Sequence, residues 1–156
     1  MTWAEAAPFL NTALIVVGWA VVHFTSRNRD RDKARRDLVV KAADALSDQV
    51  AKLVTVGVLY HSGKERESSR EIEIKSTLQD LLLQTQLINQ AVRPVRDGVQ
   101  SSKLHNAFKQ SVTARHFEDE WDKPLSASGV EVSEIAAAGI AIRAYFAEIK
   151  FEQFER

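Results

Sequence analysis

The sequence contains no cysteine, only three prolines and six glycines among 156 residues, and no net charge, because 21 Lys and Arg oppose 21 Asp and Glu. The lack of cysteine excludes a disulfide scaffold, a thiolate zinc site and a cysteine nucleophile. The scarcity of turn residues disfavours a fold of many short strands. A hydrophobic fraction of 45% without net charge argues against a disordered chain and gives no whole-chain signal for nucleic-acid binding. The composition therefore predicts a helical protein of about one domain in size.

Charged residues are also missing from residues 6–26, the window between Glu5 and Arg27. A helix of this length rises roughly 30 Å, which matches the hydrocarbon core of a bilayer. The pattern predicts a transmembrane helix. A secretory signal peptide would need a basic start and a small-residue cleavage site, and neither occurs. A buried core helix would leave the adjacent basic cluster unexplained.

Basic residues crowd the C-terminal side of this window. By the positive-inside rule, this cluster predicts a single-pass protein of the cell membrane with its N-terminus outside and residues 27–156 in the cytoplasm. The residues expected at the membrane interface, in contact with the lipid bilayer, are Trp3, Arg27, Arg29, Arg31, Lys33, Arg35 and Arg36. The predicted organisation is a tail and transmembrane helix over residues 1–26, a basic juxtamembrane segment over 27–37, and a cytoplasmic α-helical domain over 38–156.

Beyond the basic cluster, apolar residues recur at alternating spacings of three and four in four segments. We predict helices over roughly residues 30–60, 68–93 and 131–154, and a further helix that starts near Asp97 or Ser101 and ends in the polar stretch 117–124. The β-branched residues in 54–60 could instead form a strand, but no partner strand is visible. Ser68 and Glu71 have the spacing of a capping box. The expected fold class is all-α, with one N-terminal transmembrane helix followed by a cytoplasmic helical hairpin or bundle that has heptad-like stripes.

Two stripes are candidates for helix association, and their members are Leu46, Val50, Leu53, Ile74, Leu78, Leu81 and Ile88. In a part of this size, such stripes fill the protein's own core more often than they join two chains, but both alternatives stay open. Within the predicted span, Asn11 and Gly18 lie seven residues apart on one face, where an amide can bond to another helix and a glycine permits close approach. The expected partner, besides the bilayer, is another protein or a second copy of the chain.

Residue patterns that carry chemistry are missing. No glycine-rich phosphate loop, nucleophile elbow or zinc-protease motif occurs. His105 and His116 would return to one helix face about 16 Å apart, too far to share a metal ion. The sequence therefore predicts no catalytic, cofactor-binding or metal-binding residue, no nucleic-acid partner and no small-molecule substrate.

Association is the function that this pattern favours. The chain is expected to be a membrane-anchored helical protein that works as an anchor, adaptor or scaffold by binding proteins. One alternative is a self-assembling effector of a toxin or defence type that permeabilises the membrane. A second alternative is a membrane-tethered enzyme whose site has no familiar motif.

Overall fold

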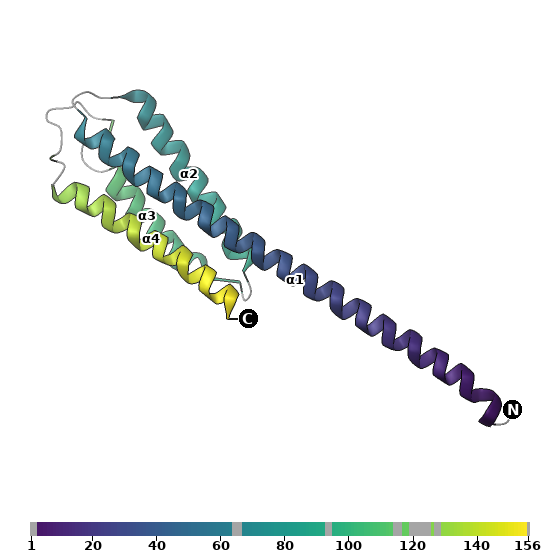
Figure 1. Ribbon diagram of the computed structural model, residues 1–156. Helices are drawn as coiled ribbons and strands as arrows, with labels where there is room; N and C mark the ends of the chain where they lie inside the picture. Colours follow the sequence, from purple (N-terminus) through teal and green to yellow (C-terminus); the bar gives the residue numbers. More distant parts are fainter. Residues whose placement is uncertain are drawn as a thin grey trace. The chain divides into compact units, whose positions relative to one another are not determined.

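The structure of the protein, a computed structural model, describes residues 3–63, 67–92, 95–113, 117–118, 126 and 129–155, and for residues 3–24 and 28 it describes the backbone alone. The regular structure of these residues is entirely α-helical, which confirms the predicted all-α class. The helices are α1 (Trp3–Ser62), α2 (Ser68–Ala91), α3 (Gly98–Val112) and α4 (Val130–Phe154) (Figure 1). The chain divides into two compact units, Met1–Asp37 and Leu38–Arg156.

The second unit is a four-helix bundle built from the C-terminal part of α1 together with α2, α3 and α4 (Figure 1). α3 packs against both α2 and α4. α1 and α4 lie side by side in opposite directions, because Asp44 pairs with Lys150 whereas Val54, ten residues later in α1, meets Gly139. Successive helices therefore run up and down, the arrangement that short connections between helix ends favour.

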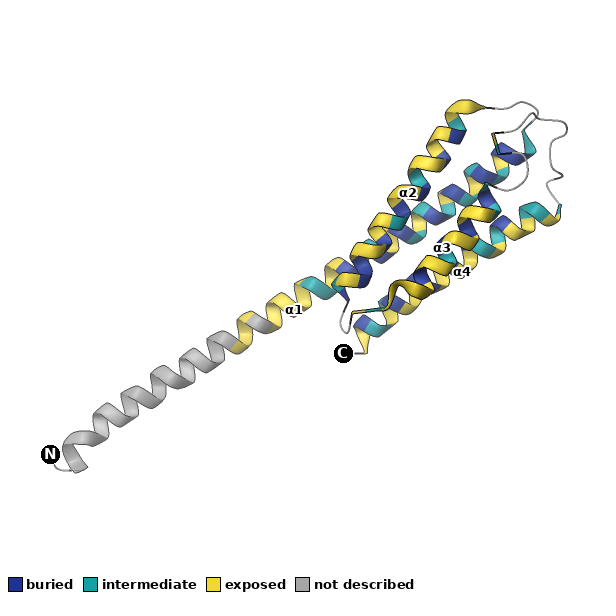
Figure 2. Cartoon of the chain, turned by 180° about the vertical axis from the view of Figure 1, so that it is seen from behind, coloured by how far each residue is buried: buried dark blue, intermediate teal, exposed yellow. Residues whose placement is uncertain are grey.

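The predicted stripes form the core of this bundle. In each helix of the bundle the buried residues recur at spacings of three and four along one side (Figure 2), and most of them are apolar. The segment 54–60 is helical, not a strand. The core residues include Leu46, Val50, Leu53, Tyr60, Ile74, Leu78, Leu81, Ile88, Phe108, Val112, Ile135, Ile142, Phe146 and Ile149.

Glycine sets the distance between α1 and α4. A Cβ atom on Gly139 would lie 2.4 Å from Cγ2 of Val54, so any side chain at this position would force the two helices apart. A Cβ on Gly57 would lie 3.2 Å from Cγ1 of Val112 on α3, which is a milder restriction. The absence of side-chain atoms at these positions lets the helix surfaces pack at close range.

A buried polar network joins three helices near the connection between α2 and α3. The Tyr145 hydroxyl donates to Asn89 Oδ1 at 2.6 Å, and Asn89 Nδ2 donates to Ser101 Oγ at 2.9 Å. Arg96 stacks on the ring of Tyr145 with 5.2 Å between the guanidinium carbon and the ring centroid, and its Nε donates to Glu152 at 3.2 Å. The network fixes the ends of α2, α3 and α4 against one another because its members satisfy buried polar groups across the core.

The predicted capping box at the start of α2 is wrong. The N-cap residue is Glu67 and not Ser68, and no side chain caps the helix. Glu71 is buried instead, and its Oε1 accepts a 2.6 Å hydrogen bond from the Tyr60 hydroxyl of α1. The Glu71 carboxylate therefore joins α2 to α1 at this end of the bundle.

The predicted membrane topology also needs correction. Within the described part of the chain, no helix is long and apolar enough to cross a membrane. This finding contradicts the expected single-pass localisation. From residue 25, where side chains are described, α1 first carries charges and then a single apolar stripe that packs into the bundle, whereas a spanning helix is apolar all round. Residues 6–24 of the expected span, together with Trp3, lie outside the residues whose side chains are described.

Candidate functional site

The predicted basic cluster lies on α1 in the first unit. Arg27, Arg29, Arg31 and Lys33 are exposed, and Arg35 and Arg36 are partly buried. Exposed acids alternate with these bases at Asp30, Asp32 and Asp37, so this part of α1 presents charges of both signs to solvent. With the membrane topology corrected, nothing in these described residues singles out a ligand. The candidate span-association residues Asn11 and Gly18 lie outside the described side chains.

The seven residues of the predicted association stripes all lie in the bundle core. Leu46, Val50, Leu53, Ile74, Leu78, Leu81 and Ile88 are at most 5% exposed. Their surfaces contact other helices of the same chain, so a second chain could reach them only if the bundle opened. The sequence left open whether the stripes pack within one chain or between two chains. In the structure these residues pack within the chain.

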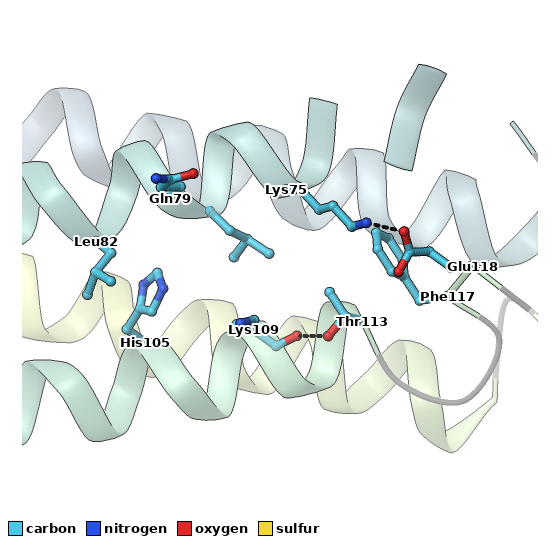
Figure 3. Close-up of a pocket in the computed structure, with 9 residues that line it drawn as sticks. Lys75, Gln79, Leu82, His105, Lys109, Thr113, Phe117 and Glu118 are labelled. Atoms are coloured by element: carbon cyan, nitrogen blue, oxygen red, sulfur yellow. Dashed lines mark hydrogen bonds and ion pairs between the residues drawn. The ribbon is translucent and has the colours of Figure 1, made fainter. Parts of the chain in front are cut away.

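A pocket of about 540 Å³ lies between α2 and α3 (Figure 3). Lys75 on α2 pairs with Glu118, and its Nζ lies 5.7 Å from the centroid of the Phe117 ring. The Thr113 hydroxyl donates to the Lys109 carbonyl at 2.8 Å. These contacts engage the side chains of Lys75, Glu118 and Thr113.

His105 is the one buried titratable residue that lines this pocket among those described. Its ring points from α3 towards Leu82 of α2 (Figure 3), and its Nδ1 is buried with no hydrogen-bond partner. Burial, reinforced by the nearby charge of Lys109, lowers the pKa of His105. The imidazole is therefore neutral at pH 7, because the charged form would lose hydration without gaining a partner. Sequence analysis assigned this residue no role.

The outer face of α4 carries an uncharged stripe of mostly apolar residues. Eight exposed positions follow one another at spacings of three and four, as in a heptad repeat. We call them the α4 seam: Val130, Ser133, Ala137, Ile140, Ala144, Ala147, Phe151 and Phe154. Ile140, Phe151 and Phe154 are 66%, 62% and 76% exposed. An apolar stripe of this length on a helix surface is typical of a contact with another helix.

Charges flank the seam in a segregated order. If Val130 takes heptad position a, the e positions hold Glu134, Ala141, Glu148 and Glu155, whereas the g positions in the helix hold Ala136, Arg143 and Lys150. One border of the seam is thus acidic and the other basic. Such borders set partner choice and orientation in helix pairs.

Other exposed apolar residues do not form a comparable stripe. On α2, exposed and uncharged residues also follow heptad spacing, but five of the seven are polar, whereas one of the eight seam residues is polar. These α2 residues are Ser69, Ile72, Ser76, Gln79, Leu83, Gln86 and Gln90. The α2 residues therefore serve as a natural reference for the α4 seam, because they have similar exposure without the continuous apolar pattern.

The sequence analysis missed the seam although its signal was present. In the helix expected over residues 131–154, one apolar stripe was considered, and it contains Ile135, Gly139 and Ile142. A second set at spacings of three and four lies on the opposite side of the helix and includes Ala137, Ile140, Ala144 and Ala147. The second pattern is recognised only when the buried face is known.

Comparison with known proteins adds no further information, since no family model, curated protein or solved structure matches this chain.

Proposed function

We propose that this protein acts by binding proteins, as an adaptor or scaffold, and that the α4 seam is its contact surface. The observation that carries the proposal is the unbroken run of uncharged, mostly apolar and exposed heptad positions along the whole of α4. Bundle helices usually expose charged and polar residues on their outer face. A helix that is apolar on both faces gains free energy when a second surface covers the outer one.

The exposed apolar side chains of the seam supply part of the free energy that association needs. The exposed fractions of Ile140, Phe151 and Phe154 add up to about two fully exposed apolar side chains. Complete burial of one such side chain contributes about 1.5–3 kcal/mol, so these three residues supply about 3–6 kcal/mol before the entropic cost of association. The methyl groups of Ala137, Ala144 and Ala147 would bury little apolar area, but their small size allows the backbone of a partner helix to come close.

Site-specific photo-crosslinking in the native cell tests this proposal. A photoreactive side chain at Ala144 on the seam should give defined protein adducts. The same group at Leu83 on α2, an exposed position outside the seam, should give none of these adducts and serves as the matched control. Equal labelling from both positions, or no protein adduct from Ala144, would contradict association through α4.

A further inference from the structure

The charge order along α4 identifies the partner of the seam. We infer that the seam binds a second copy of this chain, with the two α4 helices parallel and in register; this inference rests on the proposed function of α4. A twofold axis along the seam brings each of its residues against the same residue of the partner, which gives an isologous interface. Ile140 and Phe151 then meet their own counterparts, and Ala144 lies between them.

The flanking residues favour the parallel orientation. In a parallel helix pair, each g residue lies beside the e residue five positions later on the other helix. Arg143 therefore faces the partner's Glu148, and Lys150 faces the partner's Glu155. An antiparallel pair would instead bring e residues beside e residues and g residues beside g residues, which sets acid against acid and base against base. Only the parallel pair has opposite charges on both borders.

Existing contacts leave these groups available. Arg143 Nε donates to Ser47 Oγ at 3.1 Å, which uses one of the five N–H groups of the guanidinium. Glu148 Oε2 lies 3.6 Å from Arg96, but the Glu148 side chain is still 54% exposed. Lys150 already pairs with Asp44 of its own chain at 2.5 Å. Its ion pair with Glu155 of the second copy would form in addition to this one. The Arg143 pair is accordingly the stronger determinant of orientation.

The first experiment measures the oligomeric state of the full chain. Sedimentation equilibrium over about 10–500 µM covers the affinities expected for a small helix interface. The chain should form dimers, and Ile140→Glu should shift it to monomer while leaving the helical circular dichroism spectrum unchanged. Leu83→Glu on α2 is the control and should dimerise like the unmodified chain. A monomer at every concentration, or equal loss of dimer in both variants, would overturn the inference.

The second experiment tests the orientation by a change of charge. Arg143→Glu should weaken the parallel dimer because it sets two carboxylates against each other, and adding Glu148→Arg should restore dimerisation. In an antiparallel dimer positions 143 and 148 do not face each other, because g residues lie beside g residues and e residues beside e residues, so Glu148→Arg would have the same effect with or without Arg143→Glu. Restoration of the dimer by the second change therefore decides the orientation.

Disulfide cross-linking gives an independent test, since the chain has no cysteine of its own. In the parallel dimer, Ala137→Cys and Ala147→Cys should each cross-link to their own counterpart. The two positions lie about 15 Å apart along the helix, so an antiparallel dimer could place only one of them at its midpoint. Cross-linking at a single position would overturn the parallel register.

The failure of this inference is distinguishable from the failure of the proposed function. If the purified chain is monomeric but Ala144 gives adducts with a different protein in the cell, the second copy is excluded and association through α4 stands. If the chain is monomeric and Ala144 gives no adduct, both proposals fail.

Discussion

A methyl group added at Gly139 should destabilise the bundle because α1 and α4 touch there. The new Cβ would lie 2.4 Å from Cγ2 of Val54, about 1 Å closer than an ordinary contact. Val54 cannot swing away easily, since a β-branched side chain in a helix has one strongly preferred rotamer. Overpacking of this kind costs about 1–3 kcal/mol, and the better helix propensity of alanine returns about 1 kcal/mol. We expect Gly139→Ala to lower the free energy of unfolding by up to about 2 kcal/mol.

Gly98 provides the matched control. A Cβ on Gly98 at the start of α3 would meet nothing within 4 Å, and its φ is not positive. Gly98→Ala should therefore stabilise the protein by about 0.4–1 kcal/mol, mainly by restricting the unfolded chain. The same chemical change is thus predicted to have opposite signs at the two positions.

Urea unfolding of the full chain measures both effects, and a double-mutant cycle identifies their origin. Removal of the clashing methyl group by Val54→Ala should turn the effect of Gly139→Ala from unfavourable to neutral or favourable, with a coupling of about 1 kcal/mol or more. If both glycine variants change stability in the same direction by similar amounts, or if Val54→Ala gives no coupling, the close approach of α1 and α4 is refuted.

Three further substitutions test other parts of the structure. Phe108→Ala should cost about 3–5 kcal/mol in urea unfolding, because the ring is fully buried at the centre of the core. Tyr145→Phe should lower the free energy of unfolding by about 1–2 kcal/mol, because it removes the hydroxyl that donates to the buried side-chain oxygen Oδ1 of Asn89. The double variant with Asn89→Leu should lose less stability than the sum of the two single changes. His105 should make the protein less stable as the pH falls below about 6.5, since its pKa is lowered in the folded state and the unfolded chain then binds more protons. His105→Gln should reduce this pH-dependent loss between pH 7.5 and pH 5, and an unchanged pH profile would show that His105 does not cause it.

The bundle was predictable from the sequence because its signal is local. Each of the four inward stripes repeats every three or four residues, and the residues on those stripes are the ones that pack in the core. The close approach of Gly139 to Val54 was not predictable in this way, because it depends on the register between two helices far apart in sequence.

The sequence analysis was wrong or incomplete at residues that suit two different structural roles. Glu71 has the spacing of a helix cap, but the hydroxyl of Tyr60 takes its carboxylate into the core. The seam on α4 was hidden for a related reason. An apolar residue such as Ile140 satisfies either a buried or an exposed stripe, and only the packing of α4 on its neighbours decides which one it joins.

The two faces of α4 separate stability from association. The inward face contains Gly139, Ile142 and Phe146, whose packing stabilises the bundle. The outward face contains Ile140 and Phe151, which are mostly exposed and contribute little to the free energy of unfolding. Alanines on the outward face keep the exposed apolar area of the single chain modest, and three larger side chains concentrate the binding energy in a few positions. The acidic and basic borders give this surface its specificity. The residues that attract a helix in the parallel register repel a helix that brings like charges together.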